Sequence, residues 1–146
     1  MKQESGEAKA FRIEIDASGA TAGLTAECLG AEVAAAHGPR DERALTLAAY
    51  DDNGAWIGGI NGLFHWRWLY IRHVYVAPDW RGRGIGAALL AQAEDWARKQ
   101  QAVGLYLDTF EASAEAFYQR GGFMLVGRIV HFPPGGSRAF LQKPLA

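Results

Sequence analysis

The stretch from Val74 to Leu90 constrains this chain more than any other, because a strand, a break and a helix follow one another within it. Residues 70–76 are rich in aromatic and β-branched side chains, which is typical of a strand. Pro78 ends that pattern, and a turn with three alternate glycines leads directly into an amphipathic helical pattern. The glycines are Gly82, Gly84 and Gly86. This order predicts an α/β protein organised around one strand–turn–helix unit.

The glycine-rich turn has the chemistry of an anion site. Glycine carries no side chain, so several backbone N–H groups in such a turn can approach one ligand. The start of the following helix adds unpaired N–H groups and the positive end of the helix dipole. Arg81 and Arg83 add positive charge at the rim. A pyrophosphate is the ligand that suits this arrangement.

The remaining sequence divides into short elements separated by turn residues. We expect further strands at residues 11–15, 44–50, 56–64, 105–110, 125–131 and 137–143. We expect helices at residues 24–37, 84–101 and 113–120. The strand at 70–76, the helix at 84–101 and the strand at 105–110 form a βαβ unit, whose two strands should run parallel. We therefore predict one mixed α/β domain over residues 1–146, with residues 1–10 flexible.

Glycine also marks the hairpin that precedes the central strand. Asn53-Gly54 suits a tight turn between two antiparallel strands. Three glycines interrupt the returning strand at residues 56–64. Glycine inside a strand suggests a bulge or a close approach of another backbone.

Composition narrows the compartment and the partners. The 146 residues include one cysteine, Cys28, so an internal disulfide is impossible, and this favours a reducing compartment. No apolar run approaches the length of a membrane span, and the first residues lack a signal-peptide pattern. The net charge of -1 gives no indication of a nucleic-acid surface. No Cys/His cluster has metal-ligand spacing. We expect a cytoplasmic protein without a metal, a membrane or a nucleic-acid partner.

A dinucleotide fingerprint is a competing interpretation of the same turn. Gly82-x-Gly84-x-x-Ala87 fits that pattern, and Asp108 follows about 20 residues later, as the pattern requires. In that fold, however, the first glycine follows its strand almost at once, whereas residues 77–81 intervene here. The five residues between the strand and the first glycine therefore disfavour a dinucleotide-binding site. A Gly-Lys-Ser/Thr phosphate loop and a Gly-x-Ser-x-Gly nucleophile turn are both absent from the sequence.

Two motifs resemble those of the GNAT superfamily of N-acetyltransferases. Arg81-x-x-Gly84-x-Gly86 after a strand is similar to the acetyl-CoA motif of that superfamily. The segment at residues 116–123, Ala-Phe-Tyr-Gln-Arg-Gly-Gly-Phe, resembles its second signature. The C-terminal segment at 132–141 is similar to small, single-domain bacterial members. The resemblance implies the GNAT fold, a mixed sheet of about six or seven strands with a central βαβ unit and flanking helices.

The resemblance implies acetyl-CoA as the acetyl donor and no metal. The pyrophosphate would lie on the N–H groups of residues 83–86, and the pantetheine arm would pair with exposed backbone of the central strand. The implied cofactor-binding residues are Val74, Tyr75, Val76, Arg81, Gly82, Arg83, Gly84, Ile85, Gly86, Ala87 and Tyr118. A backbone N–H of the strand would stabilise the developing oxyanion. An amine would attack directly in a ternary complex, without an acyl-enzyme.

The resemblance also implies that Tyr118 is the general acid that protonates the leaving thiolate. A phenol titrates near 10, so it carries its proton at neutral pH. The general base stays open, because Tyr70 stands where some relatives place a glutamate. Strict alternation along the strand would turn His73 toward the core helix. The candidates for the base are Asp108, His73, Glu111, Glu14 or a chain of waters. Asp108 comes near the C-terminal end of a parallel strand, where sites of open α/β sheets gather.

The acceptor is expected to be a primary amine of a small molecule. Four tryptophans could line its pocket or serve the core, namely Trp56, Trp66, Trp68 and Trp80. The loop at 131–138 could cover the acceptor or simply join two strands. The C-terminal strands offer free edges, which makes a homodimer plausible. The alternative function is a non-catalytic CoA-binding or acyl-CoA-sensing module of the same fold.

Overall fold

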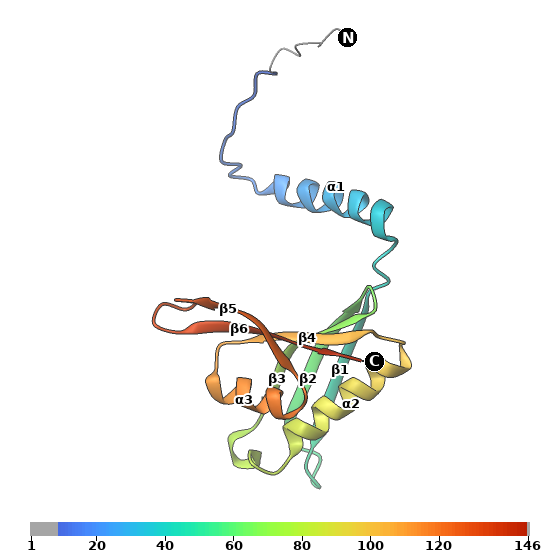
Figure 1. The fold of residues 1–146 in the computed structure, drawn as a ribbon, viewed down its shortest axis with the longest axis vertical. Helices are drawn as coiled ribbons and strands as arrows, with labels where there is room; N and C mark the ends of the chain where they lie inside the picture. The colour runs from blue at the N-terminus through green and yellow to red at the C-terminus, as the bar shows by residue number, and fades with distance from the viewer. Residues whose placement is uncertain (1–8, 146) are drawn as a thin grey trace. The chain divides into compact units, whose positions relative to one another are not determined.

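The structure is a computed structural model that describes residues 9–145. The chain forms two compact units, Met1–Pro39 and Arg40–Ala146, and each is described by itself. Figure 1 shows the order of the elements along the chain. Helices are α1 (Ala20–His37), α2 (Ile85–Lys99) and α3 (Ala112–Arg120), with a 3-10 turn, η1 (Pro78–Trp80). Strands are β1 (Arg43–Tyr50), β2 (Trp56–His65), β3 (Trp68–Val76), β4 (Gly104–Thr109), β5 (Met124–Val130) and β6 (Ser137–Pro144).

The first unit contains α1, which begins four residues before the predicted start at Leu24. The reason is Asp16, whose carboxylate accepts hydrogen bonds from the backbone N–H of Ser18, at 3.0 Å, and of Thr21, at 2.9 Å. Side-chain hydrogen bonds from Ser18 and Thr21 are the main cause of a strongly lowered pKa of Asp16. Gly38 ends the helix with a left-handed φ of 84°.

The strand predicted at residues 11–15 is wrong. These residues form no strand within the part of the chain that the structure describes. Alternating apolar residues define only a face, whereas a strand also needs a neighbouring backbone to pair with its N–H and C=O groups.

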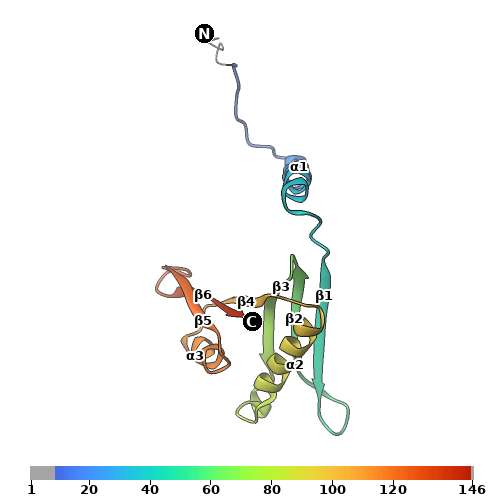
Figure 2. The same ribbon diagram turned by 45° about the vertical axis from the view of Figure 1, so that its right-hand side comes forward.

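The second unit is a six-stranded mixed sheet in the order β1-β2-β3-β4-β6-β5. Helix α2 crosses β1, β2 and β3, while α3 lies beside β4 and β5 (Figure 2). The predicted βαβ unit is confirmed, because α2 connects β3 to β4 and these two strands pair in parallel. The mixed α/β fold class is thereby confirmed. Strand β6 inserts between β4 and β5, which places the C-terminal hairpin beside the βαβ unit.

Alternate residues of the sheet form the core beneath α2. Leu69 and Ile71 of β3 and Leu105 and Leu107 of β4 are buried there with the apolar side of α2. Because successive side chains of a strand point to opposite faces, the residues between them point away from α2. The two faces of the central strands therefore have separate chemistry.

The glycines of β2 are explained by close backbone contact, as the sequence indicates. A Cβ at Gly62 would lie 2.4 Å from the carbonyl oxygen of Tyr70, and one at Gly58 would lie 2.6 Å from that of Tyr75. The predicted bulge is present too, since Asn61 pairs with His73 and Gly62 with Ile71. Arg72 is thus an extra residue in β3, and it shifts the alternation of the strand by one.

Alanine at Gly62 should destabilise the fold. The added methyl has no space between two backbones, and we expect the free energy of unfolding to fall by about 1–3 kcal/mol. The matched control is Gly127→Ala in β5, where a Cβ meets no atom within 4 Å. Urea unfolding of both variants checks this. Equal stability of the two variants would contradict the packing argument.

Candidate active site

Strands β3 and β4 separate at the C-terminal end of their pairing. The parallel ladder runs from Trp68 opposite Gly104 to Ile71 opposite Leu107 and no further. Strand β3 nevertheless continues to Val76, and β4 continues to Thr109. Backbone groups of β3 beyond Ile71 therefore face an opening instead of a neighbouring strand on that side. A peptide-like ligand can pair with such a free edge.

The glycine-rich turn lies at the end of this opening and fits an anion. Gly82 and Gly84 adopt left-handed φ values of 74° and 83°, and a Cβ at either would meet open space. No side chain caps the start of α2, and its first turn contains no acidic residue. The first N–H groups of α2 have no acceptor within the helix. The exposed amides and the positive helix end together suit a pyrophosphate.

The two arginines of the turn are held in different ways. Arg81 donates a hydrogen bond from Nε to the carbonyl oxygen of Val76, at 2.9 Å. Its guanidinium also lies 5.6 Å from the ring centre of Tyr75. Arg83 instead lies over the ring of Trp80, at 4.9 Å. Arg81 thus ties the turn to the end of β3, and the turn keeps a fixed position beside the opening.

Tyr118 is the one buried residue of α3 and is held by other rings. Phe117 and Phe123 lie against it with ring centres 5.2 Å and 5.8 Å away. Burial raises the pKa of the Tyr118 phenol above its usual value of 10, and the negative charge of Asp108 raises it further. The phenol is therefore protonated across the neutral range and can donate a proton.

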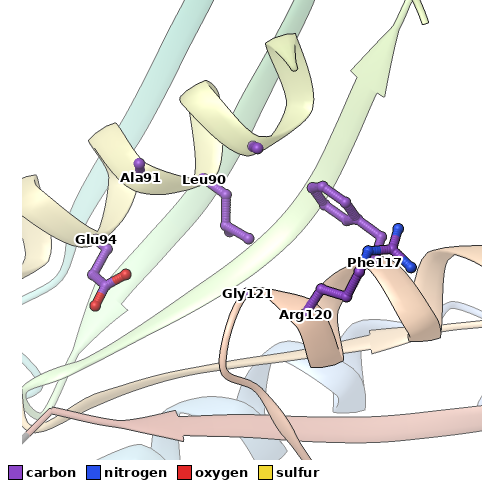
Figure 3. A pocket seen from close by; sticks show the side chains of 7 residues that line it. Leu90, Ala91, Glu94, Phe117, Arg120 and Gly121 are labelled. Carbon is purple, nitrogen blue, oxygen red and sulfur yellow. The ribbon is translucent and has the colours of Figure 1, made fainter. Parts of the chain in front are cut away.

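A groove separates α2 from α3 next to the glycine turn. Phe117 points from α3 toward α2 (Figure 3), and its ring lies 3.4 Å from where a Cβ of Gly86 would be. A Cβ at this position would make ordinary van der Waals contact with that ring. The groove holds about 260 Å³ and is lined by Ala87, Leu90, Ala91, Glu94, Phe117, Arg120 and Gly121. Its walls are mostly apolar, and its two charged residues are Glu94 and Arg120.

Asp108 is the centre of a polar network on the face of the sheet away from α2. The Tyr70 hydroxyl donates to Asp108 Oδ1 at 2.8 Å, and Arg138 Nε donates to Oδ2 at 2.7 Å. Burial and the bond to Asp108 raise the pKa of Tyr70, and the same carboxylate raises that of Arg138. Three phenylalanine rings surround the Arg138 guanidinium at 5.1–5.2 Å, namely Phe110, Phe132 and Phe140.

The other candidate bases lie in less favourable places. The expectation that His73 faces the core helix is wrong, because the bulge at Arg72 reverses the alternation. His73 is exposed, and its Nδ1 lies 3.2 Å from Oδ1 of Asn61. Glu111 is exposed at the start of α3, and Glu14 is an exposed residue of the first unit paired with Arg12.

The four tryptophans lie in three different surroundings. Trp66 and Trp68 line a cavity on the face away from α2. Trp56 is half exposed and stacks on Tyr75 with ring centres 5.8 Å apart. Trp80 lies under Arg83 near the glycine turn. The loop at 131–138 contributes Gly135, Gly136 and Ser137 to a second cavity of about 380 Å³ beside Thr109 and Glu111.

Sequence reasoning missed Arg138 and Lys143. Arg138 meets Asp108 because β6 pairs with β4, with Asp108 opposite Phe140. The available signal was a basic residue in the last strand, but the register that brings it to Asp108 depends on the insertion of β6. Lys143 reaches from β6 to two residues that line the groove between α2 and α3.

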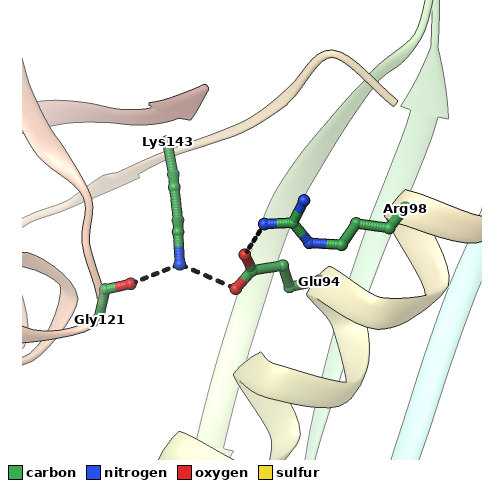
Figure 4. Close-up of polar contacts among 4 residues, drawn as sticks. All are labelled: Glu94, Arg98, Gly121 and Lys143. Carbon is green, nitrogen blue, oxygen red and sulfur yellow. Dashed lines mark hydrogen bonds and ion pairs between the residues drawn. The ribbon is translucent and has the colours of Figure 1, made fainter. Parts of the chain in front are cut away.

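Lys143 joins three elements around that groove. Its Nζ donates to Glu94 Oε2 of α2 and to the carbonyl oxygen of Gly121 at the end of α3, both at 2.8 Å (Figure 4). Arg98 donates to the other oxygen of Glu94 at 2.9 Å. Burial alone would raise the pKa of Glu94, but the hydrogen bonds from Lys143 and Arg98 lower it overall. The network fixes the end of the groove.

Stability should depend on the ionisation of Glu94. Its folded pKa lies below its usual value of 4.5, so its contribution is complete above that value and is lost as the pH falls through the lowered pKa. We expect Glu94→Gln to cost about 1 kcal/mol near pH 7, and less near pH 3. Thermal unfolding across this range measures it. Glu42→Gln, which removes a half-exposed pair with Arg40, is the control and should cost less. A cost independent of pH would contradict the assignment.

Comparison with known proteins identifies the family of this chain. The model of the acetyltransferase (GNAT) family matches residues 20–123, so the chain belongs to that family. The acetyltransferase Atu2258 of Agrobacterium fabrum is 36% identical over 106 residues, 73% of this chain and 77% of the relative. Blasticidin-S acetyltransferase of Streptomyces morookaense is 36% identical over 98 residues, 66% and 72% of the two chains. The predicted family is confirmed, and the activity is that of an acetyltransferase.

Solved structures show the same fold. An acetyltransferase from Bacillus cereus superposes with a TM-score of 0.80 at 23% identity, covering 94% of this chain and 98% of its own. Nourseothricin acetyltransferase superposes with a TM-score of 0.65 at 29% identity, covering 70% and 66%. Within residues 9–145, no helix is long and apolar enough to cross a membrane. The same described residues contain no cluster of three potential metal ligands.

Proposed function

We propose that this acetyltransferase moves the acetyl group of acetyl-CoA to a primary amine of a small molecule, by direct attack in a ternary complex. The observation that carries the proposal is the opening between β3 and β4, which begins after Ile71 and Leu107 and ends beside the uncapped start of α2. One elongated ligand with a pyrophosphate and a peptide-like arm fits both features.

The donor site divides into two parts. Backbone N–H groups from Gly82 to Ala87 would hold the pyrophosphate, with Arg83 at the rim. Backbone of Val74, Tyr75 and Val76 would pair with the pantetheine arm. Acetyl-CoA supplies an activated thioester, and an N–H of β3 would stabilise the negative charge that develops on its carbonyl oxygen. Arg81 positions the turn through its bond to Val76.

Tyr118 would donate the proton that the leaving thiolate needs. The raised pKa of its phenol keeps that proton available at neutral pH. A free thiol titrates near 8.5, so a departing thiolate accepts a proton readily from a nearby donor. Cys28 has no part in direct transfer, because no acyl-enzyme forms.

Asp108 would act on the acceptor amine. It stands at the first residue of β4 beyond the ladder with β3, and both its oxygens already accept hydrogen bonds. An ammonium group has no lone pair, so it must lose a proton before its nitrogen attacks the thioester, and Asp108 would accept that proton directly or through a water. Further lone pairs remain for an amine or an intervening water.

The name of one relative supports a small-molecule acceptor. Blasticidin-S acetyltransferase is named for an acceptor that is a small molecule, and it matches two thirds of this chain. We further propose a single N-acetyltransferase domain over residues 1–146, which the family match across both units supports. A cytoplasmic location and a homodimer stay predictions.

Replacing Tyr118 by phenylalanine should lower kcat about a hundredfold, because the proton donor is lost. The KM for acetyl-CoA should change little, because the buried ring stays. Release of CoA thiol with a panel of primary amines measures both constants. An unchanged kcat would contradict the role of general acid. Tight acetyl-CoA binding without turnover of any amine by the wild type would favour the sensing module instead.

Replacing Asp108 by asparagine should lower kcat/KM for the amine about a hundredfold, because an amide cannot accept the proton that the ammonium must lose. The KM for acetyl-CoA should stay constant. The matched control is Glu115→Gln on α3, which also breaks an arginine ion pair, with Arg128 at 2.6 Å. If both variants lose the same activity, Asp108 serves the fold alone.

A further inference from the structure

The face of the sheet away from α2 carries an aromatic cavity that the donor site does not use. It holds about 450 Å³, a volume within the range of small-molecule sites. Trp66, Trp68, Tyr106 and Phe140 supply its aromatic walls, and Gln142 and His65 add polar groups. Among the described residues that line it, none is Asp, Glu, Lys or Arg. The cavity therefore favours a neutral, flat ligand over a polycation.

A continuous row of rings leads from this cavity to Asp108. Trp68 contacts Tyr106 edge to face, with ring centres 6.3 Å apart. Tyr106 stacks on Tyr70 at 4.9 Å and an angle of 25°. The Tyr70 hydroxyl then donates to Asp108. Tyr106 and Asp108 are two residues apart on one face of β4, which is about 7 Å. A compound with one ring and a short amine side chain spans that distance.

The turn that supplies Trp66 is strained. Trp66 and Arg67 form the two-residue connection between β2 and β3, and both have left-handed φ values, 44° and 62°. Glycine or asparagine is the usual residue in such a turn, and a bulky side chain is unfavourable there. This turn places the Trp66 side chain at the cavity, where it also contacts His65 with ring centres 5.8 Å apart.

The polar groups of the cavity are neutral donors and acceptors. His65 Nε2 lies 2.7 Å from the Tyr106 hydroxyl. Burial, and then the charge of Arg40, lower the pKa of His65, so its imidazole is uncharged at neutral pH. Gln142 contributes an amide with both a donor and an acceptor. Such groups suit the edge of a heteroaromatic ring.

We propose that this cavity is the acceptor subsite and that it takes a neutral aromatic or heteroaromatic ring whose primary amine, on a short side chain, reaches Asp108. This inference rests on the proposed function and specifies its acceptor. The donor would occupy the turn and the groove at the α2 side, so ring and donor do not compete for space.

The test compares 2-phenylethylamine with 2-cyclohexylethylamine, which differ in the flat ring. We expect the wild type to favour the aromatic amine about three- to tenfold in kcat/KM. Val126 lines the cavity and is 62% exposed, so Val126→Phe should fill the cavity without disturbing the core. This variant should lose the preference and keep its KM for acetyl-CoA. The control is Val130→Phe, also exposed on β5 and outside the cavity lining, which should keep the preference.

No preference in the wild type, or a preference that survives Val126→Phe, would overturn the proposal. Failure of the proposed function has a different signature, which is no turnover of either amine. In that case, binding of 2-phenylethanol tests whether the cavity takes a ring, because this compound has the ring without the amine. Its binding is measured by titration, with tryptophan fluorescence as the signal. Binding that Val126→Phe alone abolishes supports the subsite. Absent binding, equal binding to all three proteins, or displacement of the ring by CoA contradicts it.

Discussion

The parallel pairing of β3 with β4 stops at Ile71 and Leu107, and the rest of the site depends on this stop. If the ladder continued to Val76, β4 would satisfy the backbone groups of β3 on that side, and no ligand could pair with them. The bulge at Arg72 stands where the ladder ends. An extra residue bends and twists its strand, which is a physical reason for the separation. The opening is thus built into the sequence of β2 and β3, including the glycines that allow their close approach.

Because side chains alternate along β3 and β4, the opening joins two faces of different character. The face under α2 is a packed apolar core, and the glycine turn and the groove between the helices continue from it. The other face carries the network of Asp108 and the row of rings. Two ligands can therefore approach one point from opposite sides of the sheet, as the proposed direct transfer requires.

Local patterns were sufficient for the elements of the second unit, since strands, helices and turns follow from alternation, glycine and proline over short windows. The helix around Leu89, the hairpin at Gly54 and the glycine-rich turn are predicted for that reason. Pairing beyond the hairpin and the βαβ unit does not follow from local patterns. The strand at 11–15 lacked a known partner, and the contact of Arg138 with Asp108 depends on β6 entering between β4 and β5. His73 was misplaced because one inserted residue, Arg72, reversed a strict alternation.

The network of Asp108 links several ionisable groups of the candidate site. Arg138, held among three phenylalanine rings, donates a hydrogen bond to one oxygen of Asp108, and Tyr70 donates to the other. The charge of Asp108, together with burial, keeps the Tyr118 phenol protonated. The hydrogen bond to the same carboxylate raises the pKa of Arg138, and burial together with its own hydrogen bond to Asp108 raises the pKa of Tyr70. Loss of Arg138 would leave the Asp108 carboxylate, whose side chain is 11% exposed, with Tyr70 as its remaining side-chain hydrogen-bond partner among the described residues, and breaking such a pair is costly.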